Sequence, residues 1–325
     1  MTSEFQTDLF GNVIDFEKLA SQTTGKKNKL PKIRWSFSKR GVLETCLRKY
    51  FYRYYAAKLD AFNKEKFSSV KFLKELSSQH LVGGKIIHNL IRQYFNQAKN
   101  AKELTVEWMK TIARTKISES ITYTQNVIAG KEIKQKYPPF ILQEIFYDDQ
   151  NYREIYQEVE HKVITALENF MTSPQFEQFK LSGKMPGSYV EKKIFIPLTE
   201  QINISGEADL AFYKDDAFEI NDWKTGKVED GDDSMQLLTY TLWAIEQVGV
   251  DLSKIKIFKS YLNENKIKEL SLSEREVFRN KLAIRQSAEA MLEISNFGEA
   301  GDEQAFTPCR QRKICSMCPF KKICK

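Results

Sequence analysis

The sequence predicts a mixed α/β (α+β) protein in which a sheet is covered by helices. Residues 189–198 alternate apolar and polar side chains, as a strand does. Residues 208–223 and 254–272 each contain two short apolar stretches joined by a turn, which is typical of a hairpin. Residues from about 60 to 180 place apolar side chains at spacings of three and four, as helices do. We therefore expect one mixed sheet in the second half of the chain, with helices packed beside it.

Length and composition set broad limits. The chain has 325 residues, 42% of them hydrophobic, which is enough for a substantial core. No apolar run approaches the length of about 18 residues that spans a membrane, and the N-terminus lacks the basic and apolar regions of a secretory signal. We expect a soluble cytoplasmic protein with no membrane partner. The net charge of +7 suits a polyanionic partner, although an ordinary solvated surface can carry the same charge.

The first elements of the chain carry little chemistry. Residues 1–30 are interpreted as a tail, and we assign them no function. Ser36 and Ser38 are suited to cap a following helix, which carries Cys46 and a dense set of aromatic side chains. These aromatics alternate with basic residues and could stack on bases, but packing in the core is the stronger expectation.

One side chain in the long helical region is a candidate for function. His88 follows Gly83 and Gly84 and lies at the edge of the apolar stripe of its helix, so it would point inward. Such a histidine on its own is more often a packing residue than a ligand. His80 and His161 match no motif. A break is expected at residues 137–139, where two prolines follow a tyrosine.

The hairpin within residues 208–223 contains opposed acids. If Asp215–Asp216 forms the tight turn, the register places Asp209 directly opposite Asp222, with Lys224 on the same face. Two carboxylates at that distance repel, and a divalent cation such as Mg²⁺ or Mn²⁺ would offset the repulsion. Lys224 could then orient or activate a water and stabilise phosphate charge. A surface hairpin with scattered charges is the alternative.

Two further elements flank this hairpin. The preceding strand carries Glu191, and the helix that follows, residues 234–245, places Gln236 and Tyr240 on one face at i, i+4. By themselves the two would belong to an ordinary amphipathic helix.

Four motifs thus stand in order along the chain: the helical histidine, Gly206-x-x-Asp209, Asp222-x-Lys224 and the glutamine–tyrosine pair. This series resembles the PD-(D/E)xK nucleases, in the branch typified by the nuclease domain of RecB. The resemblance implies a restriction-endonuclease-like mixed sheet with flanking helices and a large helical insertion.

The resemblance also implies roles for individual residues. The metal ligands that it implies are His88, Asp209 and Asp222, joined by the backbone carbonyl of Trp223. Lys224 would assist a water attacking phosphorus in line, while Gln236 and Tyr240 would position the strand. Glu191 corresponds to a glutamate often found in the first strand of this family. It could support the site, and an exposed strand residue is an equal alternative.

The C-terminal segment adds a cysteine cluster. Cys309, Cys315, Cys318 and Cys324 fall within 16 residues, and the fifth cysteine is Cys46. In a reduced compartment such clustering indicates a metal or redox site. The spacing of the last three, with the distant Cys46, resembles the iron-sulfur cluster of the nuclease subunit AddB and of CRISPR-associated RecB-family exonucleases. Four thiolates from Cys46, Cys315, Cys318 and Cys324 suit a 4Fe-4S cluster. Zn²⁺ is the alternative, and Cys309 is an extra cysteine relative to the family pattern.

The resemblance leads to one functional hypothesis and two alternatives. We expect a metal-dependent DNA nuclease, a single-strand exonuclease of repair, recombination or defence, with DNA as substrate and a helicase or recombination complex as a possible partner. The alternatives are a non-catalytic DNA-binding or scaffolding subunit of a recombination or CRISPR-type complex, and a zinc-stabilised nucleic-acid-binding protein. The predicted division of the chain is a tail (1–30), a cluster-bearing helix (31–60), a helical region with the histidine (61–185), the nuclease core (186–298) and the iron-sulfur segment (299–325).

Overall fold

The computed structural model describes residues 32–59, 64–98, 104–131, 138–228 and 234–324, and for 64–69 the backbone alone. The predicted tail, residues 1–30, and Tyr137 of the expected break lie outside these ranges. Within them, no helix is long and apolar enough to cross a membrane.

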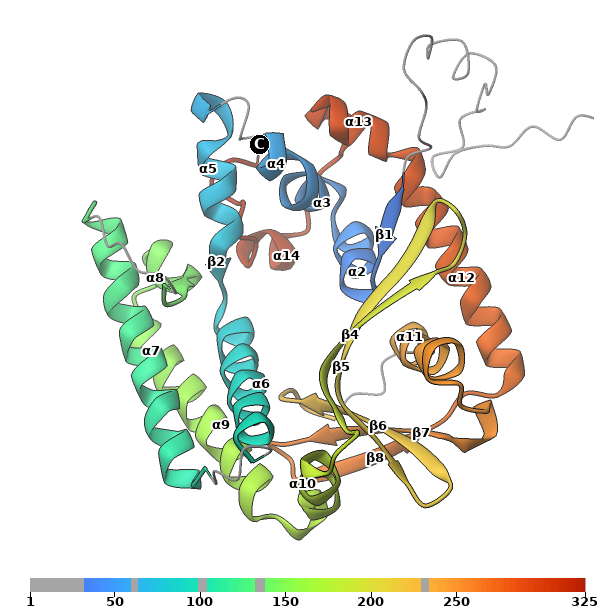
Figure 1. The fold of residues 1–325 in the computed structure, drawn as a ribbon. Coiled ribbons are helices and arrows are strands. Elements are labelled where there is room, and N and C mark those ends of the chain that lie inside the picture. Colours follow the sequence, from blue (N-terminus) through green and yellow to red (C-terminus); the bar gives the residue numbers. More distant parts are fainter. Residues whose placement is uncertain (1–31, 60–63, 99–103, 132–137, 229–233, 325) are drawn as a thin grey trace, which may run out of the picture.

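A mixed sheet of six strands forms the centre of the protein (Figure 1). Its strands are β1 (Ile33–Trp35), β4 (Tyr189–Pro197), β5 (Ile202–Lys214), β6 (Ala217–Lys224), β7 (Ile255–Tyr261) and β8 (Lys266–Leu270). Strand β5 pairs with β4 along one edge, and along its other edge with β1 near its start and β6 near its end. The pairs β1–β5 and β6–β7 are parallel and the remaining pairs antiparallel. The predicted mixed sheet and both predicted hairpins are confirmed.

The register of the β5–β6 hairpin agrees with the assumed turn. Lys214 pairs with Ala217, so Asp215 and Asp216 form the tight connection, and Asp215 adopts a left-handed backbone with φ +50°. Aspartate tolerates that conformation better than most residues. The two faces of the hairpin separate as the alternation predicted. Ala211 and Ile220 enter one hydrophobic cluster, whereas Leu210 and Trp223 enter another.

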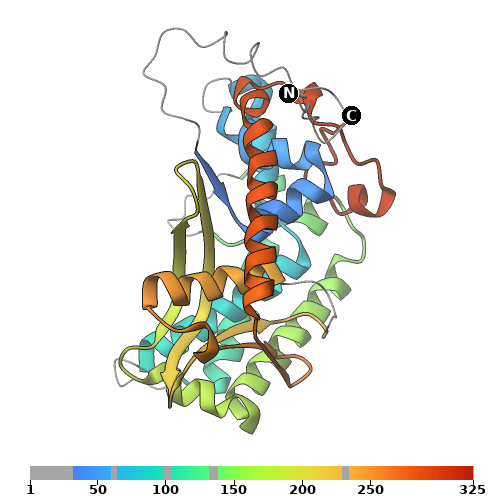
Figure 2. The same ribbon diagram turned by 90° about the vertical axis from the view of Figure 1, so that its right-hand side faces the viewer.

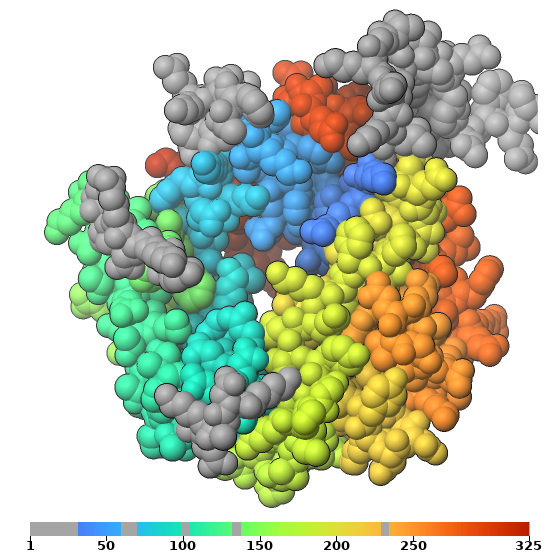
Figure 3. Space-filling model, viewed as in Figure 1, coloured from blue at the N-terminus to red at the C-terminus, as the bar shows by residue number. Residues whose placement is uncertain are grey.

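Helices cover both faces of the sheet. On one face lie α11 (Ser234–Trp243) and the long α12 (Glu274–Glu293), which runs along the outside of the molecule in Figure 2. On the other face lie α6 (Gln79–Ala98), α9 (Tyr152–Thr172) and α10 (Glu177–Lys184), with α7 (Val106–Ile128) packed outside them. The space-filling view shows a hollow near the centre, between α6 and the strands β4 and β5 (Figure 3).

The N-terminal helical segment departs from the prediction at Cys46. Helix α2 (Phe37–Thr45) is capped by Ser36, whose hydroxyl accepts a hydrogen bond from the amide of Lys39. At Cys46 the backbone is extended (φ −167°, ψ 115°), so the cysteine separates two helices instead of lying within one. Four of the five aromatic residues that follow are buried and Tyr54 is partly buried, which confirms core packing as their main role.

Shorter elements complete the chain. Within the region of helical pattern, residues 147–151 separate α8 (Gln143–Phe146) from α9. Helix α12 begins with a capping box between Ser273 and Glu276. The other elements are α3 (Leu47–Phe51), η1 (Tyr52–Ala56), α4 (Ala57–Leu59), α5 (Lys64–Glu75), β2 (Leu76–Ser77), β3 (Ile141–Leu142), η2 (Pro174–Phe176), η3 (Ala244–Val248), η4 (Leu252–Lys254), α13 (Ser295–Ala300), η5 (Glu303–Ala305) and α14 (Arg312–Ser316).

Candidate active site

Three acidic residues occupy neighbouring positions on three adjacent strands. In the β4–β5 register, the pairs on either side of Glu191 place it opposite Asp209. The β5–β6 register, continued by one residue from Leu210, places Asp209 opposite Asp222. Asp209 and Asp222 are buried, and the Glu191 side chain is 19% exposed. Like charges this close are destabilising, so the row favours a bound cation.

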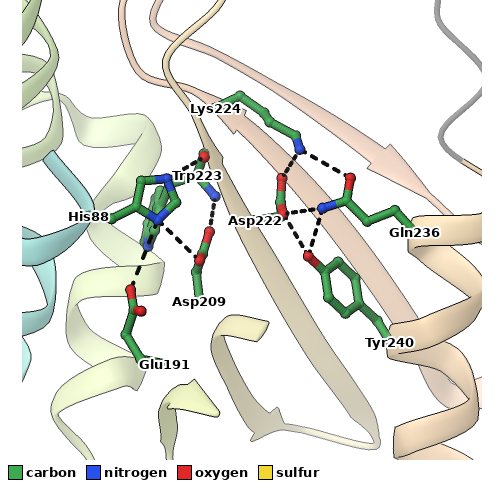
Figure 4. Close-up of polar contacts among 8 residues, drawn as sticks. All are labelled: His88, Glu191, Asp209, Asp222, Trp223, Lys224, Gln236 and Tyr240. Carbon is green, nitrogen blue, oxygen red and sulfur yellow. Dashed lines mark hydrogen bonds and ion pairs between the residues drawn. The ribbon is translucent and has the colours of Figure 1, made fainter. Parts of the chain in front are cut away.

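His88 reaches this row from helix α6. Its Nδ1 lies 3.2 Å from Asp209 Oδ1 and 3.9 Å from Glu191 Oε1, and its Nε2 lies 3.1 Å from the backbone carbonyl of Trp223 (Figure 4). Among the described residues, His88, Glu191 and Asp209 form the one group of three metal-ligating side chains whose ligand atoms all lie within 4.8 Å of one another. The predicted inward orientation of the histidine therefore brings it to the acids.

These residues fit a divalent metal ion. Both nitrogens of His88 face acceptor oxygens, whereas a neutral imidazole has one donor. Burial lowers the pKa of His88, but the charges of Asp209, Glu191 and Asp222 outweigh it and raise the pKa to about 9. Burial and the charge of Asp209 raise the pKa of Glu191 to about 7, and burial raises that of Asp209. Carboxylate and carbonyl oxygens are ligands for Mg²⁺ and Mn²⁺, and replacing the proton by such an ion would satisfy all four groups.

The backbone at Glu191 is strained. Its φ is +49°, within strand β4, and a non-glycine residue pays for a left-handed conformation. Such strain is typically retained where it serves a site. Here it accompanies the placement of the Glu191 carboxylate beside His88.

A second group of side chains surrounds Asp222. The Tyr240 hydroxyl and the Gln236 Nε2 both donate to Asp222 Oδ1, at 2.7 Å and 3.0 Å. Gln236 Nε2 also lies 2.9 Å from the Tyr240 hydroxyl. Lys224 Nζ donates to Gln236 Oε1 (3.2 Å) and forms an ion pair with Asp222 Oδ2 at 2.6 Å.

The structure thus divides the predicted residues into two adjoining groups (Figure 4). His88 and Asp209 lie together as expected, and Glu191, which the sequence left open, joins them. Asp222 is turned toward Lys224, Gln236 and Tyr240. Trp223 links the groups, because its amide donates to Asp209 Oδ2 at 2.7 Å while its carbonyl faces His88.

The five cysteines lie together at a second place, whose lining residues do not include those of the acidic row. All five are free thiols, and all line one cavity of about 80 Å³. Burial raises the pKa of Cys318 and Cys324, and nearby thiols raise it further. A tetrahedral zinc site with bonds of about 2.3 Å holds its sulfurs about 3.8 Å apart. Within the described chain, no three cysteine sulfurs lie within 4.8 Å of one another.

Comparison with known proteins agrees with this site. A family model of the PD-(D/E)XK nuclease superfamily matches residues 34–325, and the chain therefore belongs to that superfamily. The superfamily implies metal-dependent nuclease activity on DNA, typically with Mg²⁺ or Mn²⁺, and the mixed sheet with its helices is consistent with the restriction-endonuclease-like fold.

Two other comparisons add little. No curated protein matches the chain. A solved structure titled "Crystal structure of SSO0001" is similar over 66% of this chain and 96% of its own, at 16% identity and a TM-score of 0.31. That score is too low to support an argument.

Proposed function

We propose that this protein is a metal-dependent exonuclease of the RecB-like branch that degrades single-stranded DNA. The observation that carries the proposal is the convergence of His88, Glu191 and Asp209 beside a lysine held in place by Asp222. Every position that the chemistry needs is occupied by a competent side chain. A subunit that had lost catalysis would not need this costly arrangement of buried charge.

The metal would be held by His88, Glu191, Asp209 and the Trp223 carbonyl, with the Asp222 carboxylate on the neighbouring strand. When bound, it supplies positive charge for the phosphate and lowers the pKa of a water.

Lys224 is the residue placed to assist the attack. Its ammonium group is fixed between Asp222 Oδ2 and Gln236 Oε1, so it is pre-oriented toward a water or a phosphate oxygen. The water oxygen forms a bond to phosphorus as the bond to the 3′ oxygen breaks, leaving a 5′-phosphate and a 3′-hydroxyl. Gln236 and Tyr240 hold Asp222 and thereby position the lysine.

Linear and circular single-stranded DNA test the exonuclease hypothesis. With Mn²⁺ or Mg²⁺, anaerobically purified protein should degrade the linear strand and leave the circle intact, because an exonuclease needs an end. Cleavage of both at equal rates would show an endonuclease instead. Tight binding without cleavage under any divalent metal would support the non-catalytic subunit.

We also propose a 4Fe-4S cluster bound by Cys46, Cys315, Cys318 and Cys324. It is supported by the cavity that all four cysteines line, because four thiolates are the ligand set of such a cluster. Anaerobic protein should be brown and should contain iron and sulfide, and Cys324→Ser should lose both. Cys309→Ser is the matched control and should keep the colour. Colourless protein with stoichiometric zinc would contradict the proposal.

A further inference from the structure

We propose that a groove between α6 and α7 holds the DNA strand, with Lys85, Arg92 and Lys116 binding its phosphates on both sides of the metal site. The inference rests on the proposed nuclease function and specifies its substrate path. The groove encloses about 350 Å³, the size of a small ligand pocket. Its lining residues are Lys85, Ile86, His88, Asn89, Arg92, Lys116, Phe140 and Glu191.

The groove is continuous with the candidate active site. His88 and Glu191 line it and also belong to the group that fits a metal. A strand lying in the groove would therefore present one of its phosphates to that group.

Helix α6 carries one cationic residue before His88 and one after it. Lys85 precedes His88 by three residues and Arg92 follows it by four, so all three lie on one face of α6. At about 1.5 Å per residue, the Cα atoms of Lys85 and Arg92 lie about 4.5 Å before and about 6 Å after that of His88 along the axis. Lys116 faces them from α7. Phosphates flanking the scissile one would meet a cation on each side.

Among the described residues, no ion pair neutralises the cations of the groove. None of the ion pairs among the described residues uses Lys85, Arg92 or Lys116. Of the described residues that line the groove, Glu191 is the one acid, and it belongs to the group that fits a metal. Three cations in one groove favour the binding of a polyanion such as a nucleic acid. Neutralising its phosphates releases the counterions that are condensed on them.

Phe140 favours a single strand over a duplex. Its half-buried ring lines the groove, and the ammonium of Lys85 lies 5.5 Å from the ring centroid. An aromatic side chain next to a phosphate-binding cation can stack an unpaired base, whereas a paired base is covered by its neighbours in the duplex.

Affinity for fluorescein-labelled oligothymidylate, measured by anisotropy over a salt series, tests the groove. The measurements use full-length protein carrying Asp222→Asn, so that no DNA is cut. Adding the double substitution Lys85→Gln/Arg92→Gln should lower the affinity at least about tenfold. It should also reduce the slope of log K against log salt concentration by about 1.4, because each lost phosphate contact contributes about 0.7. Lys281→Gln/Arg285→Gln, a matched lysine–arginine pair on α12, should change neither. Phe140→Leu should weaken binding without changing the slope.

Cleavage kinetics separate the groove from the chemistry. In the active protein, the Lys85/Arg92 pair should raise KM far more than it lowers kcat. If this variant binds DNA with the same affinity as the α12 control, the groove proposal is wrong, even if the wild type cuts DNA. If instead the wild type binds but never cuts, while the variant loses binding, the proposed nuclease function fails and the groove stands.

Discussion

Glu191 adds a third acidic side chain to the pair Asp209 and Asp222 in the proposed metal site. Its carboxylate stands opposite Asp209 and beside His88, at a backbone conformation that costs energy. Burial and like charge together raise its pKa to about 7. Without a bound metal, the ionised Glu191 side chain therefore destabilises the folded state. A bound cation would remove that cost.

Glu191→Gln should move stability and metal affinity in opposite directions. The ionised carboxylate is disfavoured in the folded state, a penalty that sets in above pH 4.5 and is complete above about pH 7. At pH 8 the metal-free variant should melt higher than the wild type, while its Mn²⁺ affinity falls at least about tenfold. Glu200→Gln, an exposed loop change, is the control. A variant that binds Mn²⁺ as tightly as the wild type would remove Glu191 from the site.

The protonation of His88 should make metal binding depend on pH. Its pKa of about 9 in the metal-free protein means that it carries a proton at pH 7, which a metal must displace. Affinity for Mn²⁺ should therefore rise with pH between 7 and 8.5, by up to about tenfold per unit for one proton released. Calorimetry in buffers of different ionisation enthalpy measures both the affinity and the proton release. His88→Gln should weaken binding and flatten the dependence, and a wild-type affinity independent of pH would contradict this role.

At the scale of elements, a close approach between β5 and α11 assembles the second half of the site. A Cβ atom added at Gly206 would lie 2.8 Å from Cγ2 of Thr239, closer than real contacts allow. The glycine thus permits α11 to lie against the strand, and α11 carries Gln236 and Tyr240 to Asp222. The first residue of the glycine-x-x-aspartate motif has a packing role that its spacing did not reveal.

Gly206→Ala should displace α11. We expect a loss of about 1–3 kcal/mol of unfolding free energy, as for other overpacked positions, together with a fall in kcat because the hold on Asp222 loosens. Adding Thr239→Ser removes the methyl group that the alanine meets and should restore most of both losses. Denaturant unfolding and cleavage rates of the single and double variants provide the measurement. Failure of the serine to rescue would contradict the packing explanation.

The sequence predicted local structure better than long-range placement. The β5–β6 register followed from the turn at Asp215–Asp216 and from side-chain alternation, both of which are local. Glu191 could not be assigned, because its partner Asp209 is fixed by pairing between strands and by a strained backbone. The helix break at Cys46 was missed, because the surrounding residues favour a helix while the cysteine is held extended.

At the scale of the whole molecule, the cysteine segment joins three parts of the chain. Arg48 forms an ion pair with Glu303 at 2.7 Å and donates to the Phe306 carbonyl at 2.6 Å. From the helical region, Gln143 donates to the Met317 carbonyl at 3.0 Å and Tyr147 to that of Pro319 at 2.6 Å. A cluster on these cysteines would therefore fasten the N-terminal helices and the α8 region to the C-terminus.

Loss of the cluster should destabilise the protein globally. Cys324→Ser should lower the melting temperature and make both the N-terminal helices and the C-terminal segment sensitive to protease, because metal binding contributes folding free energy. Cys309→Ser should have a much smaller effect. Differential scanning calorimetry and limited proteolysis of anaerobic protein measure the two consequences. An unchanged melting temperature for Cys324→Ser would show that the cysteines do not hold the fold.

We propose that the acidic row, His88 and Lys224 together form a catalytic metal site. The most direct measurement is Mn²⁺-dependent cleavage of end-labelled single-stranded DNA by the wild type, by Lys224→Met and by Lys227→Met, an exposed lysine three residues further along. We predict that Lys224→Met lowers the rate at least about 100-fold while DNA binding is retained, and that Lys227→Met cuts like the wild type. Undiminished cleavage by Lys224→Met would contradict the claim.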